Sequence, residues 1–303
     1  MTVRDETSGA DLLKRVRGIE IRTRRTVSEA FAGQFRSAFR GRGMEFEEVR
    51  PYQVGDDVRS IDWNVSARAG SPHVKLFREE RELLVFLAVD LSASLDFGTR
   101  GGLKRDTVAE IAATVALSAN RSNDKTGLLL FTDRIEKVVP PRKGSRHVLR
   151  IVRDCLSFRP EGRGTDLALA LAEMSRLLRR RAVIFVLSDF LPGVRGGDWR
   201  RPMALLRQRH DVIPVAVRDA FERDVPRVGF LDVVDAESGA RTSIDTFSAA
   251  GRRRYRELAE ARERSLDEGF RRLKLDAVRL ESGQDPARPL ETFFRRREAR
   301  RSR

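Results

Sequence analysis

Short apolar runs alternate with longer amphipathic stretches from about residue 81 onward. Each apolar run ends in a polar residue, which is typical of strands buried on both faces of a parallel sheet. These runs predict strands at residues 83–90, 126–133, 182–189 and 211–219. Between them, apolar residues recur at helical spacing, which predicts helices at residues 103–120, 145–158, 166–180 and 201–210. The alternation predicts an α/β fold with a doubly wound, mostly parallel sheet covered by helices.

Weaker signals complete this domain. They predict an edge hairpin strand at 135–139, a short strand at 229–234, a long charged helix at 247–273, a strand at 274–280 and a last helix from residue 289.

The first 80 residues follow another pattern. Residues 10–30 have apolar side chains near helical spacing, which predicts an N-terminal helix followed by a glycine-rich turn. Residues 40–80 place turn-forming residues between short β-like pieces and predict an irregular β extension. We therefore divide the chain into an N-terminal extension at 1–80, an α/β domain at 81–285 and a basic C-terminal helix and tail at 286–303.

The charge balance allows a polyanionic partner. The 303 residues include 60 Lys and Arg against 45 Asp and Glu, a net charge of +15. The excess is spread along the chain, and the two Trp and two Tyr residues are too few to interleave with it as stacking platforms would. Nucleic-acid binding through the Arg-rich surface and tail is therefore an alternative rather than the leading hypothesis.

The sequence predicts a cytoplasmic protein without a membrane span. Its apolar runs are interrupted by charge well before the roughly 18 residues that a membrane helix needs. The first residues lack the apolar core of a secretory signal. The single cysteine, Cys155, has no partner for an internal disulfide and is predicted to lie in the core.

Oxygen-bearing side chains gather at the predicted strand ends. Asp90, Ser92 and Ser94 follow the first core strand, Thr165 precedes a helix, and Asp189 ends another strand. In an open parallel sheet, ligands bind outside the carboxyl ends of the strands. These oxygens, with no histidine or cysteine among them, favour Mg²⁺, with Mn²⁺ and Ca²⁺ as alternatives. Taken singly, the same residues also suit helix caps.

These five residues carry a resemblance. Asp90-Leu-Ser92-Ala-Ser94, Thr165 and Asp189 are similar in order and spacing to the metal-ion-dependent adhesion site of von Willebrand factor A domains. The resemblance implies that the serines and the threonine contact the ion directly or through water and that the aspartates lie close to it. It also implies that a partner's carboxylate completes the coordination shell.

A second resemblance covers roughly residues 15–300. The segment GRGMEFEEVRPYQVGDDVRSIDWNVSAR, the VKLFREE run and the closing PLETFFRRREAR resemble a bacterial family of unassigned function that carries such a domain. Its members commonly accompany MoxR-type AAA+ ATPases. The resemblance implies an ATPase partner, an acidic protein client, or both.

A further set of polar and aromatic residues at 50–63 has two interpretations. It forms either an interaction surface or ordinary turns with buried ion pairs. Its members are Arg50, Tyr52, Asp56, Asp57, Arg59, Asp62 and Trp63.

The sequence gives little support to an enzymatic function. The chain has no Gly-Lys-Ser/Thr phosphate loop, no GxSxG elbow and no GxGxxG after the first strand. Its three histidines, His73, His147 and His210, are scattered. A metal-dependent hydrolase ranks last, because no positioned base accompanies the metal ligands. Together with the two resemblances, this implies a non-catalytic, metal-dependent protein-binding adaptor that acts with a MoxR-type AAA+ ATPase.

Overall fold

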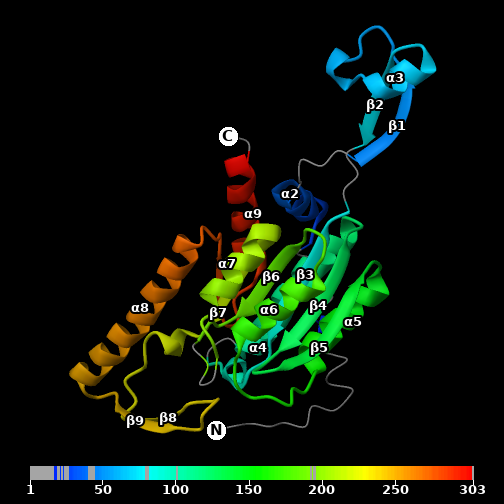
Figure 1. The fold of residues 1–303 in the computed structure, drawn as a ribbon. Coiled ribbons are helices and arrows are strands. Elements are labelled where there is room, and N and C mark those ends of the chain that lie inside the picture. The colour runs from blue at the N-terminus through cyan, green and yellow to red at the C-terminus, as the bar shows by residue number, and fades with distance from the viewer. Residues whose placement is uncertain are drawn as a thin grey trace. The chain divides into compact units, whose positions relative to one another are not determined.

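The structure is a computed structural model. It describes residues 27–39, 45–78, 82–99, 102–191, 193 and 196–301, with isolated positions at 17, 18, 21 and 23. The chain forms two compact units, one of residues Phe39–Glu82 and one of Met1–Ala38 with Leu83–Arg303. The larger unit thus includes residues on both sides of the smaller one, whereas the predicted segments were 1–80, 81–285 and 286–303. The described helices and strands of both units are labelled in Figure 1.

A six-stranded sheet forms the centre of the larger unit, in the order β10-β7-β6-β3-β4-β5. All neighbours are parallel except β4 and β5, so the predicted edge hairpin strand is confirmed. The near-continuous apolar runs form its buried strands, as predicted. The strands are β3 (Leu84–Asp90), β4 (Lys125–Phe131), β5 (Ile135–Arg142), β6 (Val183–Ser188), β7 (Asp211–Arg218) and β10 (Val278–Glu281).

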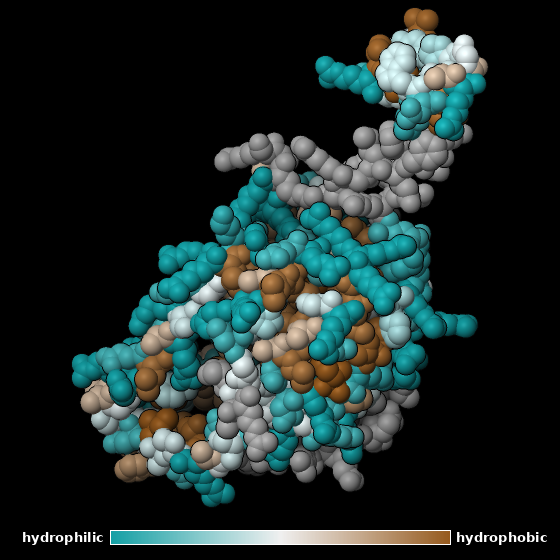
Figure 2. Space-filling model, in the orientation of Figure 1, coloured by the Kyte–Doolittle hydropathy of each residue, from teal (hydrophilic) through white to brown (hydrophobic). Residues whose placement is uncertain are grey.

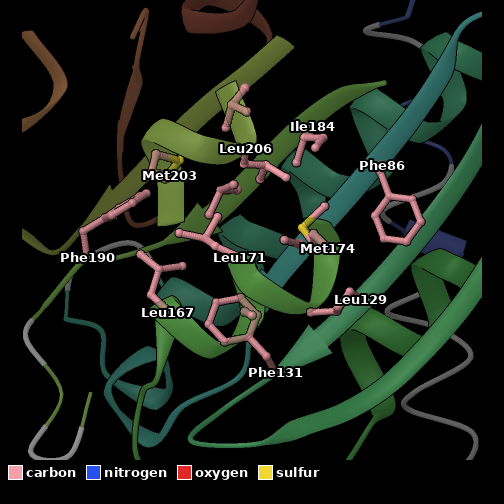
Figure 3. Packing of buried hydrophobic residues seen from close by; sticks show 14 of the residues in the cluster. Phe86, Leu129, Phe131, Leu167, Leu171, Met174, Ile184, Phe190, Met203 and Leu206 are labelled. Atoms are coloured by element: carbon pink, nitrogen blue, oxygen red, sulfur yellow. The ribbon is translucent and has the colours of Figure 1, made fainter. Parts of the chain in front are cut away.

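Helices cover both faces of this sheet, which confirms the predicted α/β class. One face packs against α6, α7 and α8 in a continuous apolar cluster that includes Phe86, Phe131, Leu171 and Met203 (Figure 3). Helices α4 and α5 pack against each other, and both contact β4. The helices of the α/β core are α4 (Lys104–Arg121), α5 (Ser145–Ser157), α6 (Leu167–Leu177), α7 (Arg200–Arg209) and α8 (Ala249–Arg272).

The last helix, α9 (Ala287–Arg301), confirms the predicted C-terminal helix and belongs to the larger unit. Phe294 is fully buried and meets Phe31 and Phe35 edge to face, with ring centroids 5.4 and 5.5 Å apart. Both partners lie on α2 (Glu29–Phe39), where the sequence predicted a turn. That prediction was wrong because phenylalanines four residues apart form an apolar helical stripe, and Gly33 does not interrupt it. More than half of the predicted helix at 10–30 falls outside the described residues.

A separate hairpin connects the sheet to α8. Strands β8 (Phe230–Val234) and β9 (Arg241–Asp245) pair with each other and not with the central sheet (Figure 1). The sequence predicted β8 but missed β9, whose side chains are mostly exposed and lack an apolar run. In the part of the chain that the structure describes, no helix is long and apolar enough to cross a membrane.

The smaller unit combines a hairpin with a short helix. Strands β1 (Glu45–Pro51) and β2 (His73–Arg78) are antiparallel. Between them lie a 3₁₀ turn, η1 (Val58–Ser60), and the helix α3 (Trp63–Ala69). Gly70 ends α3 in the left-handed conformation with φ of 70°, as a glycine does at many helix ends.

Candidate functional site

Four of the five predicted ligands lie in one buried hydrogen-bonded chain at the carboxyl ends of the neighbouring strands β3 and β6. The Ser92 N–H donates to Asp90 Oδ1 at 2.8 Å. The Oγ atoms of Ser92 and Ser94 are 3.1 Å apart, and the Ser94 hydroxyl donates to Asp189 Oδ2 at 2.7 Å. Strand ends therefore bring these hydroxyls and carboxylates together, as expected for a site at the edge of a parallel sheet.

Asp90 is fully buried, and β6 contacts it directly. Ser188, which the sequence analysis did not single out, donates its hydroxyl to Asp90 Oδ2 at 2.6 Å. Burial, followed by repulsion from Asp189, raises the pKa of Asp90 to about 7. A cation bound beside these two carboxylates would relieve their repulsion and favour the ionised form of Asp90.

Thr165 lies in the loop before α6, outside this hydrogen-bonded chain. The Ala93 N–H donates to Arg163 O at 2.9 Å and so links this loop to the segment that carries the two serines. Thr165 and Asp189 line the same cleft. The Thr165 hydroxyl donates to Glu237 Oε1 at 2.6 Å.

Helix capping does not account for Ser92. It precedes a 3₁₀ turn, η2 (Ala93–Asp96), but its side chain makes no capping hydrogen bond. Asp166 does cap a helix, because its Oδ1 accepts from the Leu169 N–H at 2.9 Å. The capping interpretation thus holds for Asp166, while the Ser92 hydroxyl remains directed to Ser94.

A buried lysine joins the site, and the sequence analysis missed it. The Lys104 ammonium is fully buried and lies 2.7 Å from Asp189 Oδ2, and it also pairs with Glu222. Burial acts to lower the pKa of Lys104, but the two carboxylates outweigh burial and raise it. A signal existed, because Lys104, Val108 and Ile111 share one helical face and the other two are buried core residues.

Asp219 fixes the position of Glu222. The Asp219 N–H donates to Glu222 Oε2 at 3.0 Å in a reciprocal capping box around a short 3₁₀ turn, η3 (Ala220–Glu222). Thr99 and Ser282 donate their hydroxyls to Asp219 at 2.7 and 2.5 Å. Burial acts to raise the pKa of Asp219, but the hydrogen bonds from Ser282 and Thr99 outweigh it and lower the pKa. Asp219 therefore stays ionised and ties three loops together at the edge of the site.

The site opens into a cleft of about 1070 Å³ beside α8, where Figure 2 shows a hollowed surface. Asp189, Thr165 and Glu222 line its wall. Five arginines also line the cleft: Arg200, Arg218, Arg223, Arg262 and Arg279. Burial and then the neighbouring Arg218 lower the pKa of Arg279. The lining is mixed in charge, because six acidic residues face the same space: Asp189, Asp198, Asp219, Glu222, Glu263 and Glu281. Among the described residues, Arg223 and Arg262 form no ion pair, so these two arginines are available to an acidic group.

The donor set fits a hard cation. Within the described residues, no three His, Cys, Asp or Glu side chains are grouped as metal ligands, so hydroxyls must supply part of any coordination shell. Ser92, Ser94 and the carboxylates of Asp90 and Asp189 are oxygen donors of the kind that Mg²⁺ accepts. Lys104 already neutralises part of the charge on Asp189 and competes with a cation for that carboxylate.

The candidate surface in the smaller unit consists largely of turn and cap chemistry. Arg50 forms two 2.7 Å hydrogen bonds with Asp56. Asp62 caps α3 and pairs with Lys75 at 2.8 Å. The Tyr52 hydroxyl donates to Asp56 O at 3.5 Å, and Asp57 caps η1. The remaining two members of the set, Arg59 and Trp63, are exposed. Trp63 is 68% exposed and gives this unit an apolar contact point.

The three histidines form hydrogen bonds to backbone groups and not to the candidate ligands. His73 Nδ1 and His147 Nε2 each lie 2.8 Å from a backbone carbonyl oxygen, and His210 Nδ1 accepts from the Ala182 N–H at 3.2 Å. Cys155 is buried in the core as predicted, and burial raises the pKa of its thiol to about 12.

Comparison with solved structures returns low similarity. BatB from Bacteroides thetaiotaomicron is 14% identical with a TM-score of 0.46, over 72% of this chain and 99% of that chain. An aerotolerance-related membrane protein from Bacteroides fragilis is 14% identical with a TM-score of 0.47, over 71% of this chain and 99% of that chain. Neither similarity assigns the fold to a particular family.

Comparison of sequences is more informative. An uncharacterized protein of Mycobacterium tuberculosis is 34% identical over 239 residues, which cover 78% of this chain and 74% of that protein. An uncharacterized protein of Mycobacterium bovis matches to the same extent. A family profile described as a protein of unknown function, DUF58, matches residues 48–265. Since this match covers most of the chain, the protein belongs to the DUF58 family.

Proposed function

We propose that this protein is a non-catalytic, metal-dependent protein-binding adaptor. Its site would hold Mg²⁺ through Asp90, Ser92, Ser94, Thr165 and Asp189, in the manner of a metal-ion-dependent adhesion site in a von Willebrand factor A-like domain. The observation that carries this proposal is the buried chain of hydroxyls and carboxylates from Asp90 to Asp189. Buried serine hydroxyls that bond neither to backbone carbonyls nor to helix ends are well placed to bind a cation.

Two arginines of the neighbouring cleft, Arg223 and Arg262, support an acidic partner. A cation held by three neutral hydroxyls and two carboxylates retains affinity for a further anionic ligand. Arg223 and Arg262 lie on the same cleft and can pair with additional acidic side chains of that partner. A segment with several Asp or Glu residues is therefore the partner chemistry that the site favours.

The adaptor would work in the cytoplasm with a MoxR-type AAA+ ATPase. The basis is the resemblance of residues 15–300 to a family that accompanies such ATPases. The ATPase would supply energy, and this protein would capture the acidic client or the ATPase itself. The nucleic-acid alternative gains less support, because Arg297 and Arg300 of the basic helix pair with Asp211 and Asp276.

A capture experiment tests the proposal. The tagged wild-type protein and an Asp90→Ala variant are incubated with native lysate in Mg²⁺ or in chelator, and the retained proteins are identified. We expect the wild type to retain an AAA+ ATPase or a defined acidic protein only in Mg²⁺, and the variant to lose at least ten-fold in capture, about 1.4 kcal/mol.

The control is Asp232→Asn, a charge-neutralising change at an exposed residue of β8. It should capture as the wild type does. The proposal would be refuted if Asp90→Ala retained the same partner, or if the wild type captured equal amounts of it in Mg²⁺ and in chelator. Salt-labile nucleic acid in every sample would favour the basic surface instead, because phosphate contacts weaken steeply with ionic strength.

A further inference from the structure

A carboxylate from a distant part of the chain reaches the candidate site. Glu237 lies in the turn between β8 and β9, 72 residues beyond Thr165, and its Oε1 accepts the Thr165 hydroxyl at 2.6 Å. The hairpin is not part of the central sheet. Glu237 therefore joins this separate hairpin to Thr165, one of the five predicted ligands.

The turn orients Glu237 through its own hydrogen bonds. Asp235 Oδ1 accepts from the N–H groups of Glu237 at 3.1 Å and Ser238 at 2.7 Å. The Gly239 N–H donates to Asp235 O at 2.8 Å, and Gly239 adopts φ of 74°, which favours glycine. The turn that presents Glu237 is thus preorganised by its own hydrogen bonds.

The chemistry of a hydroxyl permits both contacts at Thr165. A threonine hydroxyl has one proton to donate and two lone pairs to offer. It can donate its proton to Glu237 while a lone pair faces a cation. A carboxylate hydrogen-bonded to a metal-binding hydroxyl lies beside the ion itself, and carboxylates are preferred ligands of hard cations.

We infer that Glu237 is the chain's own acidic ligand at this site, in the position that the proposed function gives to a partner's carboxylate. The inference rests on the proposed function, because it requires the cation. It adds that the β8–β9 hairpin closes the site when no partner is bound. An acidic partner must then displace Glu237 rather than enter an open position.

The hairpin is suited to such displacement. Phe230 is 80% exposed and Val234 53% exposed, so few apolar contacts hold these strands in place. An isolated two-stranded hairpin has marginal stability. The two strands are tied to each other at the base of the hairpin, because buried Thr246 accepts from the Val228 N–H at 2.8 Å and donates to Gly229 O at 2.6 Å. The hairpin can therefore move away from Thr165 as a unit without losing its own hydrogen bonds.

The test compares Glu237→Gln with Asp232→Asn, a matched neutralisation on the same hairpin at an exposed position. Calorimetry measures Mg²⁺ affinity, and hydrogen exchange follows the amides of Ser238 and Gly239. We expect Glu237→Gln to weaken Mg²⁺ binding roughly ten-fold or more, as loss of a group at a metal site does, and Asp232→Asn to leave it unchanged. Mg²⁺ should slow exchange at both amides in the wild type but not in Glu237→Gln.

The outcomes separate this inference from the proposed function. Equal Mg²⁺ affinity in the wild type and Glu237→Gln, with no effect of Mg²⁺ on hairpin exchange, would overturn the internal ligand and leave the metal site standing. Absence of saturable Mg²⁺ binding to the wild type would overturn both.

Discussion

Replacing Asp90 with asparagine is expected to stabilise the metal-free protein at pH 8 and to abolish its response to Mg²⁺. Asparagine keeps an acceptor for the Ser92 N–H, and its amide can donate to Ser188 Oγ once that hydroxyl rotates. It removes the buried charge that Asp189 repels. The variant should therefore fold normally and differ from the wild type mainly in charge.

The pH dependence follows from the raised pKa. Asp90 has a pKa of about 7 in the folded protein against an ordinary value of 3.8, so the folded state holds the proton more tightly. Between about pH 4 and pH 7, rising pH removes the proton more readily from the unfolded chain, and the stability of the metal-free wild type falls. The full difference is on the order of 4 kcal/mol. Asp90→Asn lacks this contribution.

Thermal unfolding at pH 5 and pH 8, with and without Mg²⁺, measures both effects. Mg²⁺ at about 100 times its dissociation constant should stabilise the wild type by roughly 2.7 kcal/mol and the variant not at all. A wild-type pH slope identical to that of Asp90→Asn would show that the buried carboxyl is not perturbed. A Mg²⁺ response preserved in the variant would show that the cation binds elsewhere.

Replacing Lys104 with methionine is expected to cause the largest loss of stability, roughly 3–5 kcal/mol in the absence of Mg²⁺. The substitution keeps the length of the apolar stem but leaves Asp189 buried beside Glu222 without their shared cation. Removing one partner of a buried ion pair is costly because an uncompensated charge stays in the interior. Mg²⁺ should bind Lys104→Met more tightly than the wild type and restore part of the lost stability.

Denaturant unfolding with and without Mg²⁺ tests this prediction. Lys125→Met, at the exposed start of β4, is the matched control and should change stability by less than about 1 kcal/mol. A loss in Lys104→Met no larger than in this control would contradict the role of Lys104 as the internal counter-charge. Weaker Mg²⁺ binding in Lys104→Met would contradict its competition with the metal.

Apolar periodicity predicted the central sheet well because the strands are buried on both faces. The run from Val183 to Ser188 has no exposed position, and such a run has few alternatives to a strand in this setting. The strand ends then located Asp90 and Asp189 without further information, because parallel strands share one carboxyl edge.

Other parts of the site depend on tertiary contacts that leave little trace in the sequence. Lys104 looks like an ordinary charged residue at a helix start, and only its place on a buried helical face distinguishes it. Glu237 lies in a polar turn of a largely exposed hairpin, and nothing in its neighbourhood indicates that it meets Thr165. The helix α2 lies where a glycine-rich turn was predicted, although Phe31 and Phe35 have helical spacing and pack on Phe294.

The most direct test of the central claim is a calorimetric titration of Mg²⁺ into the wild type and into a Ser92→Ala, Ser94→Ala double variant. The double variant retains both carboxylates and Lys104, so it changes only the two hydroxyls of the buried chain. We predict saturable binding of one ion to the wild type and its loss in the double variant. No saturable binding to the wild type, or equal affinity in the two proteins, would contradict a metal site built from these residues.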